Sequence, residues 1–568
     1  MRIYLDNGSN PMPEFQLPDD FTAEISRTNP FLTDVGSQSV PMTLPASEHN
    51  MKLIGWQYHL TAKKRPMRKT AAILSDNGVW MRGSLYIDQA NYKEGISCTF
   101  YTNEGKLYEN IKNFILKDLD WPKYTGEGDG LTAKTYYWMN HFLSVMEDQS
   151  SALPDYYIFS VTTDYTFVLH TEKDFGETLI INQFQSIADG SLDFEAKKER
   201  TYKDGYGEGA TAYTVPQGYG VTPFLRLGYI LRHIFEYFGY TLHTNIFDTD
   251  VSFKRLCLLN NTADAIVAGT LDYSQLLPEA MTVEDFINVI RKKFAIEFVE
   301  KNGIVLVRSW NQAIEDAPDV DLSTFIRNDA SWIAEDKKAI VIECQGTRDM
   351  SEYTLTKTVL KHEKAEKESE EENVSSDDKT PFEDISLLYY YPYLEETIYI
   401  VAPYIGSISH KNSELVLTNH SSAEEEDNET LDLMFCFSVP DKQKTAIGGA
   451  RYYGGTIWSY DNDKKIWGIL SLVAHEVEGD VNPITKATDN LYTILYEERD
   501  KMLLQANQQI VCDARMPAVN IVNMDVSIPK IISGQKVLIE RIVYVLGRPD
   551  LCQITARTLH LFPDETAT

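Results

Sequence analysis

Apolar and polar residues alternate in several short runs of the first hundred residues, which is the pattern of half-buried β-strands. These runs span residues 21–25, 69–74, 79–87 and 96–101, and they are rich in Tyr, Phe, Trp, Thr and Ile, which strands favour. The connection over residues 29–45 contains three prolines, which disfavour a helix and indicate an extended arm. The pattern therefore predicts a β-rich N-terminal region.

Four further segments carry apolar residues at spacings of three and four, the pattern of an amphipathic helix. They span residues 107–119, 222–238, 282–294 and about 489–505. The stripe of the first one consists of Leu107, Ile111, Phe114, Ile115 and Leu119.

Capping signals mark the start of two of these helices. Thr222 followed by Pro223 predicts a helix start at that point, with a glycine just past the helix end. Thr282 predicts a capping box, in which Asp285 reaches back to the cap. This third helix runs into two apolar stretches separated by a turn containing Asn-Gly, which is a strong hairpin signal.

The C-terminal end again reads as strands, over residues 509–514, 519–526, 537–546 and 553–562. Before them, β-rich sequence is interrupted by two acidic runs. One lies at residues 363–384, where ten acidic residues face three lysines, and the other at 424–429. Such runs are typical of solvated loops.

These patterns predict an α+β, multidomain fold with β-barrel-like, tube-forming domains near both ends and α+β domains between them. We expect a β-rich domain with a closing helix, an aromatic β-rich region, an α+β domain containing the helix and hairpin, a β-rich region with the acidic loops, and a C-terminal helix with strands that complete a second tube-like domain. Their predicted boundaries are 1–120, 121–215, 216–345, 346–485 and 486–568.

Composition narrows the classes of function. The chain has 568 residues, of which 43% are hydrophobic and 24% charged, as in a folded globular protein. Its net charge of −31 argues against binding nucleic acid through the phosphates and against docking on an anionic membrane. No stretch is apolar enough to span a bilayer, and the start resembles a strand and a turn rather than a signal peptide, so we expect a soluble protein without stable membrane insertion. Six scattered cysteines indicate a reducing cytoplasm as the place of synthesis.

Three motifs hint at chemistry, and each lacks a residue that the chemistry needs. His475-Glu476 begins like a zinc-protease helix, but Gly479 stands where the second histidine belongs. Asp461-Asn462-Asp463 begins like a calcium loop without its glycine and final glutamate, and a turn between strands is the simpler interpretation. Gly218-Tyr219-Gly220 lacks the lysine and hydroxyl residue of a phosphate loop.

Nucleophilic catalysis has no recognisable motif either, because the sequence contains no Gly-x-Ser-x-Gly elbow and no cysteine in a nucleophile context. A carboxylate pair for glycoside hydrolysis stays open, since acidic residues are abundant. We predict no enzyme activity, no catalytic, cofactor-binding or metal-binding residues, and no cofactor.

Stretches near both ends and in the middle resemble one family. These are residues 25–31 (ISRTNPF) with 36–37 (GS), 41–45 (PMTLP) and Asn50, residues 220–227 (GVTPFLRL), the helix at 491–505, and residues 532–539 (ISGQKVLI), 542–547 (IVYVLG) and 557–559 (RTL). They resemble tail-tip proteins of the baseplate-hub, or tail-associated, family from phages and prophages of Bacteroides-like hosts.

The resemblance implies a virion structural protein, assembled in the bacterial cytoplasm, with two barrel-like domains per subunit that build a ring. It implies a homotrimer that joins the tail tube to the distal fibre or spike. The expected partners are a distal tail ring or tail tube protein, a tape-measure protein and a fibre or spike, with DNA passing only in transit. An acidic lumen would repel DNA phosphates and let the DNA slide. The alternatives are a distal tail ring or injection-system adaptor, a tail-tip cell-wall hydrolase, and a secreted carbohydrate-binding protein, which the absence of a signal peptide disfavours.

Overall fold

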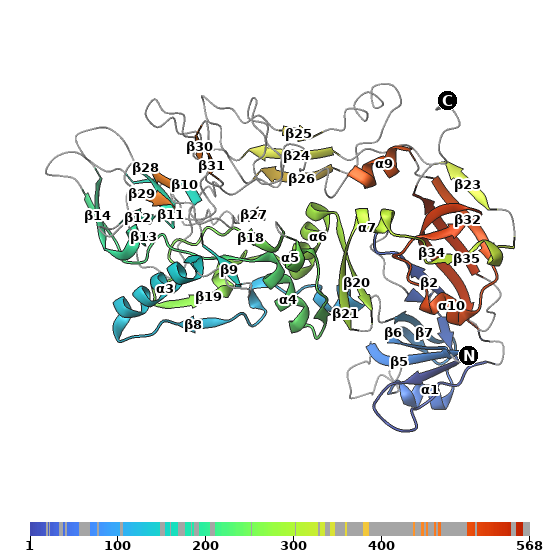
Figure 1. Ribbon diagram of the computed structural model, residues 1–568. Coiled ribbons are helices and arrows are strands. Elements are labelled where there is room, and N and C mark those ends of the chain that lie inside the picture. The colour runs from blue at the N-terminus through green and yellow to red at the C-terminus, as the bar shows by residue number, and fades with distance from the viewer. Residues whose placement is uncertain are drawn as a thin grey trace, which may run out of the picture.

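The computed structural model describes two long parts of the chain, residues 1–334 and 497–559, and eight short strands between residues 341 and 466. The gaps in the first part are residues 19–20, 22, 33–37, 40–41, 56–68, 77–78, 103–105, 148–153, 159–160, 168–176, 183, 187–191, 205–210, 251–252, 302 and 328–329; those in the second are 506–507 and 547–551. Figure 1 shows an elongated molecule with strands at one end and a mixed body of helices and strands beside them.

One sheet of 13 strands combines the beginning and the end of the chain. Its hydrogen-bonded order is β1-β5-β6-β7-β3-β2-β34-β35-β32-β23, with β4 paired to β7, β33 to β34 and β22 to β33. The N-terminal strands are β1 (Arg2–Leu5), β2 (Ala23–Thr28), β3 (Gln38–Ser39), β4 (Met42–Leu44), β5 (Lys69–Asp76), β6 (Val79–Asn91) and β7 (Gly95–Thr102).

The remaining strands of this sheet come from later in the chain. They are β22 (Val320–Asp321), β23 (Ser331–Ala334), β32 (Gln508–Ala514), β33 (Lys530–Ile532), β34 (Gln535–Leu546) and β35 (Cys552–Thr558). Helix α1 (Glu48–Leu53) packs near the N-terminal strands, and α10 (Ala518–Asn523) near β34 and β6.

The two groups of strands meet where β2 pairs antiparallel with β34, from Ala23 opposite Leu546 to Thr28 opposite Arg541. In Figure 1 the blue β2 accordingly lies among the red strands β34 and β35. Buried residues from both ends, such as Ile25, Phe100, Ile510 and Ile542, form one hydrophobic core. Burial of these apolar side chains is the main force holding the two ends together.

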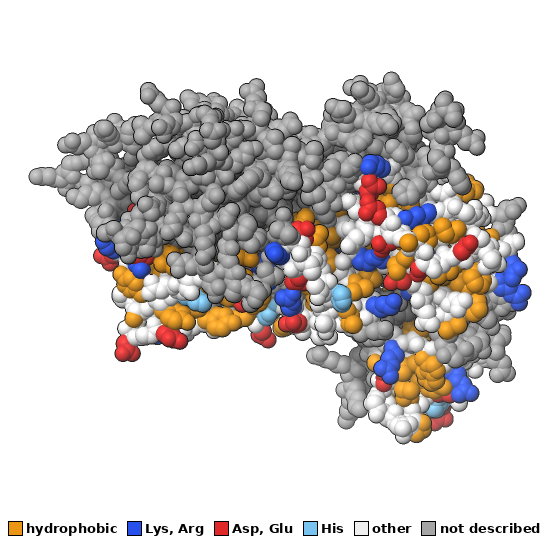
Figure 2. Space-filling model, viewed as in Figure 1, with side chains coloured by type: hydrophobic (Ala, Val, Ile, Leu, Met, Phe, Trp, Pro, Cys, Tyr) orange, Lys and Arg blue, Asp and Glu red, His pale blue; other side chains and the backbone are white. Residues whose placement is uncertain are grey.

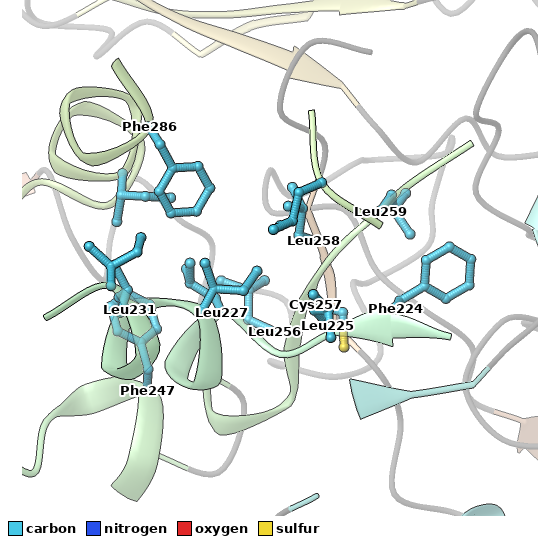
Figure 3. Close-up of a cluster of buried hydrophobic side chains, with 14 of the residues drawn as sticks. Phe224, Leu225, Leu227, Leu231, Phe247, Leu256, Cys257, Leu258, Leu259 and Phe286 are labelled. Carbon is cyan, nitrogen blue, oxygen red and sulfur yellow. The ribbon is translucent and has the colours of Figure 1, made fainter. Parts of the chain in front are cut away.

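A second, larger core lies in the body between the two ends. Figure 3 shows part of it, where Leu227 and Leu231 of one helix lie near Phe247 and Phe286 of two others. The elements of the body are α2 (Lys106–Ile111), η2 (Leu116–Asp118), β8 (Lys123–Thr125), α3 (Gly130–Glu147), β9 (Tyr156–Tyr157), β16 (Phe224–Leu225), α4 (Leu227–Tyr237), β17 (Thr241–Leu242), α5 (Ile246–Thr249), η4 (Phe253–Arg255), β18 (Leu256–Leu258), β19 (Thr270–Asp272), η5 (Tyr273–Leu276), α6 (Val283–Phe294), β20 (Ile296–Lys301), β21 (Ile304–Ser309) and α7 (Trp310–Glu315).

Small sheets surround this body. The pairs are β10 (Val161–Phe167) with β11 (Glu177–Ile181), β12 (Phe184–Ser186) with β13 (Leu192–Phe194), β14 (Arg200–Asp204) with β15 (Thr211–Val215), β28 (Thr445–Ile447) with β29 (Ala450–Tyr452), and β30 (Ser459–Asp461) with β31 (Lys464–Ile466). Strand β24 (Val341–Gly346) lies between β25 (Thr358–Leu360) and β26 (Lys379–Asp384), and β27 (Phe435–Phe437) pairs with β18. The short elements η3 (Glu195–Lys197), η6 (Ser323–Phe325) and α9 (Glu497–Gln505) complete the described part.

The structure confirms the α+β, multidomain class, and it confirms the predicted helix with its hairpin. The Thr282 hydroxyl accepts a hydrogen bond from the Asp285 backbone N–H at 3.0 Å and donates to its carboxylate at 2.6 Å. Helix α6 buries Phe286, Ile290 and the other residues of its predicted stripe, and β20 pairs with β21 across a turn with Gly303 at φ 82°. The domain boundaries at 120, 215, 345 and 485 remain a prediction.

The helix predicted from Thr222 begins later. Helix α4 starts at Leu227 with Arg226 as its N-cap, after the short strand β16. Thr222 has a different role, because its backbone N–H and its hydroxyl bind the side chains of Asn182 and Asn260. These tertiary hydrogen bonds override the local capping signal.

The stripe predicted over residues 107–119 belongs to two short elements, α2 and η2. Asn113 adopts a left-handed backbone conformation, with φ 68°, and ends the first helix. Leu107 and Leu119 of the stripe are buried, whereas Phe114 is 43% exposed. The periodicity therefore identified the apolar residues but not the break between the elements.

The aromatic β-rich region predicted over residues 121–215 contains strands β8 to β15, and it also contains the 18-residue helix α3, which buries Trp138 and Phe142. Another prediction was wrong about the type of element. The strand predicted at 519–526 is instead helix α10, which buries Ile521 and leaves Val519 49% exposed. Short β-branched runs fit either element, and tertiary contacts decide between them.

Several predictions fall largely outside the described residues. Of the acidic run at 363–384, the structure describes only Lys379–Asp384, which is strand β26, and residues 424–429 lie outside. Residues 489–496 of the predicted C-terminal helix and 560–562 of the last predicted strand also lie outside.

The body is attached to the sheet by an aromatic contact at Trp310, the first residue of α7. Its ring packs edge-on against Phe31, with 5.1 Å between the ring centroids, and the Arg499 guanidinium of α9 lies 4.5 Å from its centroid. Phe31 follows β2 closely, so this contact links the body to the sheet.

We predict that Trp310→Ala destabilises the protein by about 3–5 kcal/mol, because it removes a buried ring and leaves a cavity between Phe31 and Arg499. Thermal unfolding followed by circular dichroism measures this loss. Tyr92→Ala is the matched control, since Tyr92 is 70% exposed and its removal should change stability by no more than about 0.5 kcal/mol. Equal effects of the two changes would contradict the assignment.

Candidate functional site

The segment 25–31, quoted above for its resemblance, binds the C-terminal part of the chain through Arg27. This side chain is only 6% exposed, and its Nη1 donates hydrogen bonds to the carbonyl oxygens of Ile521, Val522 (3.1 Å) and Met524 (3.0 Å). These carbonyls belong to the end of α10, where a helix leaves carbonyls without intrahelical partners. The buried Arg27 guanidinium donates hydrogen bonds to these carbonyls. The negative end of the helix dipole in turn stabilises its positive charge.

Asn29 makes the second tie, and it is completely buried. Its Nδ2 donates to the carbonyls of Val526 at 2.6 Å and Ile539 at 2.8 Å, while its Oδ1 accepts from the Phe31 backbone N–H. The Asn29 backbone N–H donates to the Glu540 carbonyl at 2.9 Å. One side chain near the start of the chain therefore binds two backbone sites near its C-terminal end.

Side chains of β34, the strand that contains most of the C-terminal stretch quoted above, make further contacts with the N-terminal strands. The Nε of Arg541 donates to the Ser26 hydroxyl at 2.8 Å, and the Tyr544 hydroxyl contacts the Met81 sulfur at 3.2 Å. The stretches at the two ends of the chain thus form one physical unit. We call this unit, made of residues 25–31 and 532–547, the terminal junction.

The middle stretch, residues 220–227, is buried, and neighbouring segments form hydrogen bonds with its backbone. The Asn182 side chain donates to the Thr222 carbonyl at 2.8 Å, and the Asn260 side chain donates to the Pro223 carbonyl at 2.8 Å. The Gly220 N–H donates to the Ala263 carbonyl at 2.6 Å. This pattern satisfies buried backbone groups, so the stretch is a folding element rather than a binding loop.

Lys530 in β33 is a buried charge beside the terminal junction. Its ammonium lies 2.6 Å from the Asp319 carboxylate and donates to the carbonyls of Asp525 at 2.6 Å and Ile528 at 2.9 Å. Burial lowers the pKa of Lys530, while Asp319 opposes that change. Together with the parallel pairing of β22 and β33, this contact fastens the segment after α7 to the sheet.

Two more cationic side chains form hydrogen bonds between the body and the part of the chain that contains the large sheet. Arg308 of β21 donates to the carbonyl and the hydroxyl of Ser527, at 3.0 and 2.8 Å, and pairs with Asp316. Lys536 of β34 donates to the Ile314 carbonyl at 2.6 Å. The body therefore meets the sheet through charged hydrogen bonds in addition to the Trp310 contact, and such directed contacts restrict the relative orientation of the two parts.

The most perturbed titratable groups of the body surround Tyr273. Its hydroxyl donates to the Asp155 carboxylate at 3.3 Å, and the rings of Tyr124, Tyr156 and Tyr229 pack edge-on against it at 5.6–6.0 Å. Burial raises the pKa of Asp155 and of Tyr273. Perturbed groups are candidates for catalysis, but Tyr273 is itself 2% exposed and belongs to the main core. Desolvation within an aromatic core therefore accounts for these pKa shifts.

The structure describes two of the three motifs singled out in the sequence. Asp461 ends β30 opposite Lys464 of β31, so the two strands pair on either side of residues 462–463, which lie outside the described part. Gly218 and Gly220 have φ of 83° in a buried turn, where a glycine tolerates a left-handed backbone. His475 and its neighbours lie outside the described residues.

The described part of the chain contains no group of three or more His, Cys, Asp or Glu side chains placed to hold a metal ion. Burial raises the pKa of Cys98 to about 12 and that of Cys512 to about 11, so both thiols are protonated at neutral pH and are poor nucleophiles. None of the described helices is long and apolar enough to cross a membrane.

Comparison with known proteins gives only distant similarities. No protein-family model matches the chain, and no curated protein matches its sequence. Among solved structures, prophage tail protein gp18 from Listeria monocytogenes EGD-e aligns with a TM-score of 0.34 and 7% identity, over 98% of this chain and 94% of that one. The 43 kDa tail protein of prophage MuSo2 from Shewanella oneidensis aligns with a TM-score of 0.33 and 7% identity, over 98% of each chain. TM-scores this low do not establish a common fold.

We predict that Asn29→Ala lowers the stability of the protein by about 2–4 kcal/mol, because the buried carbonyls of Val526 and Ile539 lose their donor. Asn29→Asp keeps the shape but removes both N–H donors, so it should destabilise at least as strongly. Thermal unfolding measures both effects. Asn140→Ala, in an exposed position on α3, is the control and should stay within about 0.5 kcal/mol. A wild-type melting temperature for Asn29→Asp would refute the role of these donors.

Proposed function

We propose that this chain is a structural protein of a phage tail tip, which forms a ring-shaped baseplate hub between the tail tube and the distal fibre or spike. The observation that carries the proposal is the terminal junction. The stretches that resemble hub proteins at the two ends of the sequence form neighbouring strands of one 13-stranded sheet. Segments that are distant in the sequence but resemble the same family support the proposal more strongly when they fold next to one another.

The geometry suits a scaffold. A twisted sheet of more than about ten strands curls on itself, and curled sheets are the walls of barrels and tubes. Buried arginine, asparagine and lysine side chains fasten the sheet to itself and to the body. The strongly perturbed Tyr273 belongs to the main hydrophobic core, which supports a role in assembly rather than in catalysis.

The proposed partners are two further copies of this chain, a distal tail ring or tail tube protein, a tape-measure protein and a fibre or spike, with DNA only in transit. The strands of the large sheet contain eight Lys or Arg and six Asp or Glu residues, although the whole chain carries −31. On the face shown in Figure 2, basic and acidic side chains both occur over this part of the molecule. Repulsion of DNA phosphates by an acidic lumen would therefore have to come from elements outside these strands.

We predict that the purified full-length protein is a trimer, with a mass three times the 64.8 kDa of one chain. Light scattering coupled to size-exclusion chromatography, or native mass spectrometry, measures this mass directly. A hexamer would favour the alternative of a distal tail ring. A chain that remains monomeric up to tens of micromolar would contradict a ring-forming subunit.

The alternative of a cell-wall hydrolase has a separate test. We predict that the protein leaves no cleared zone in a zymogram containing host cell wall, because the buried Cys98 and Cys512 thiols are poor nucleophiles and the Tyr273 hydroxyl beside Asp155 belongs to the main core. Lysozyme in a neighbouring lane serves as the positive control. Clearing at the position of this protein would overturn the non-enzymatic assignment.

A further inference from the structure

The turn after β1 places an asparagine directly before a glycine. Asn7 and Gly8 are both exposed, and Gly8 has φ 74° at a position where a Cβ would have no atom within 4 Å. No described residue accepts a hydrogen bond from the Gly8 backbone N–H. Glycine has no side chain to shield its backbone nitrogen. The Gly8 nitrogen is therefore unhindered, and it directly follows the residue that carries the Asn7 side-chain amide.

The Asn7 side chain is held by the residue that follows the glycine. Its Oδ1 accepts hydrogen bonds from the Ser9 backbone N–H at 3.0 Å and from the Ser9 hydroxyl at 2.6 Å. Asparagine commonly binds its own backbone in this way, two residues further on. The Ser9 hydroxyl also lies 3.2 Å from the Pro11 carbonyl, but its contact with Asn7 is the shorter one. Two donors thus point at one oxygen of an exposed amide.

These contacts favour attack on the carbon of the Asn7 amide, Cγ. The hydrogen bond from the Ser9 N–H closes a ring of atoms that includes both Cγ and the Gly8 nitrogen, so the two atoms are kept near one another. When a nucleophile adds to Cγ, negative charge develops on Oδ1. Donors that already point at this oxygen stabilise that charge, as the donors of an oxyanion hole do in an enzyme.

We propose that Asn7 is a site of spontaneous deamidation, a modification that requires water and no enzyme. The Gly8 backbone nitrogen gives its proton to hydroxide or a buffer base and forms a bond to Cγ of Asn7. The Cγ–Nδ2 bond breaks, and the nitrogen takes up a proton and leaves as ammonia. Water then opens the cyclic imide. Addition of water at Cγ yields aspartate, whereas addition at the Asn7 backbone carbonyl carbon yields isoaspartate, in which the main chain runs through Cγ.

The modification changes the end of the 13-stranded sheet. Either product places a new negative charge directly after β1, and isoaspartate also lengthens the main chain there by one carbon. The backbone on both sides of the turn is fixed, because the Leu5 N–H donates to the Pro13 carbonyl at 2.8 Å and the Asp6 N–H donates to the Ala71 carbonyl at 2.9 Å. The inference goes beyond the proposed function and does not depend on it.

The test follows the full-length protein during incubation in mildly alkaline buffer, by mass spectrometry of its tryptic peptides. The peptide of residues 3–27 contains both Asn7 and Asn10. We expect Asn7 to gain the mass difference between a hydroxyl and an amino group, with fragment spectra placing the change at this residue. Asn10 is the internal control. It is also exposed, but the nitrogen of Pro11 carries no hydrogen and cannot attack it.

Ser9→Ala tests the part of the structure in the reaction. It removes the hydroxyl donor to Asn7 Oδ1, and we expect it to slow the conversion about threefold or more in the folded protein. In a synthetic peptide of residues 1–13, where the fold does not hold the turn, the same substitution should leave the rate unchanged. Ser9 is exposed, so thermal unfolding of the variant should match that of the wild type.

Each outcome decides a part of the proposal. An Asn7 that stays unchanged in the folded protein, while the synthetic peptide converts, overturns the site. Conversion of Asn10 at the same rate also overturns it, because the reaction would then not depend on the Gly8 nitrogen. Equal rates for wild type and Ser9→Ala in the folded protein overturn the role of the two donors. Conversion at Asn7 alone, slowed by Ser9→Ala only in the folded protein, supports the proposal.

Discussion

The antiparallel pairing of β2 with β34 is the constraint on which the rest of the structure depends. It joins residues 23–28 to residues 541–546, which are separated by almost the whole sequence, and it turns two groups of strands into one sheet with one core. The pairing is secured from the side by Arg27 and Asn29, whose side chains donate to carbonyls of α10, of the segment after it and of β34. Closing so long a loop is entropically costly, and burial of apolar residues from both ends offsets that cost.

The body is attached to the sheet both where the chain enters it after β2 and where the chain leaves it after α7. Phe31, just after β2, packs on Trp310 of α7, and the segment after α7 returns to the sheet at β22, where Lys530 meets Asp319. Charged hydrogen bonds from Arg308 and Lys536 add direction to these apolar contacts. These directed contacts restrict the orientation of the body relative to the sheet.

Burial is the chief cause of the pKa shifts of three ionisable groups that hold segments together. The pKa of Tyr273 and of Asp155 is raised, and that of Lys530 lowered, chiefly by desolvation. Each of these groups binds a structural partner, as when the Tyr273 hydroxyl donates to Asp155. These polar groups thus fix how segments meet. In the same way, hydrogen bonds from Asn182 and Asn260 hold the backbone at Thr222 and Pro223, so that the helix starts only at Leu227.

The sequence by itself determined those features that depend on neighbouring residues. The side-chain cap at Thr282, the stripe of α6 and the glycine turn of the hairpin involve interactions within a few residues and formed as expected, with the Asp285 carboxylate accepting from the Thr282 hydroxyl. The α+β class followed from the same local periodicities. What only the tertiary structure decided depends on distant partners: the union of both ends in one sheet, the helical form of α10 beneath Arg27, and the loss of the Thr222 cap to Asn182 and Asn260. Local patterns show which residues are apolar. They do not show which distant side chain, such as Arg27 for the carbonyls of α10, will provide the hydrogen bonds that a buried backbone needs, and these bonds influence which element forms.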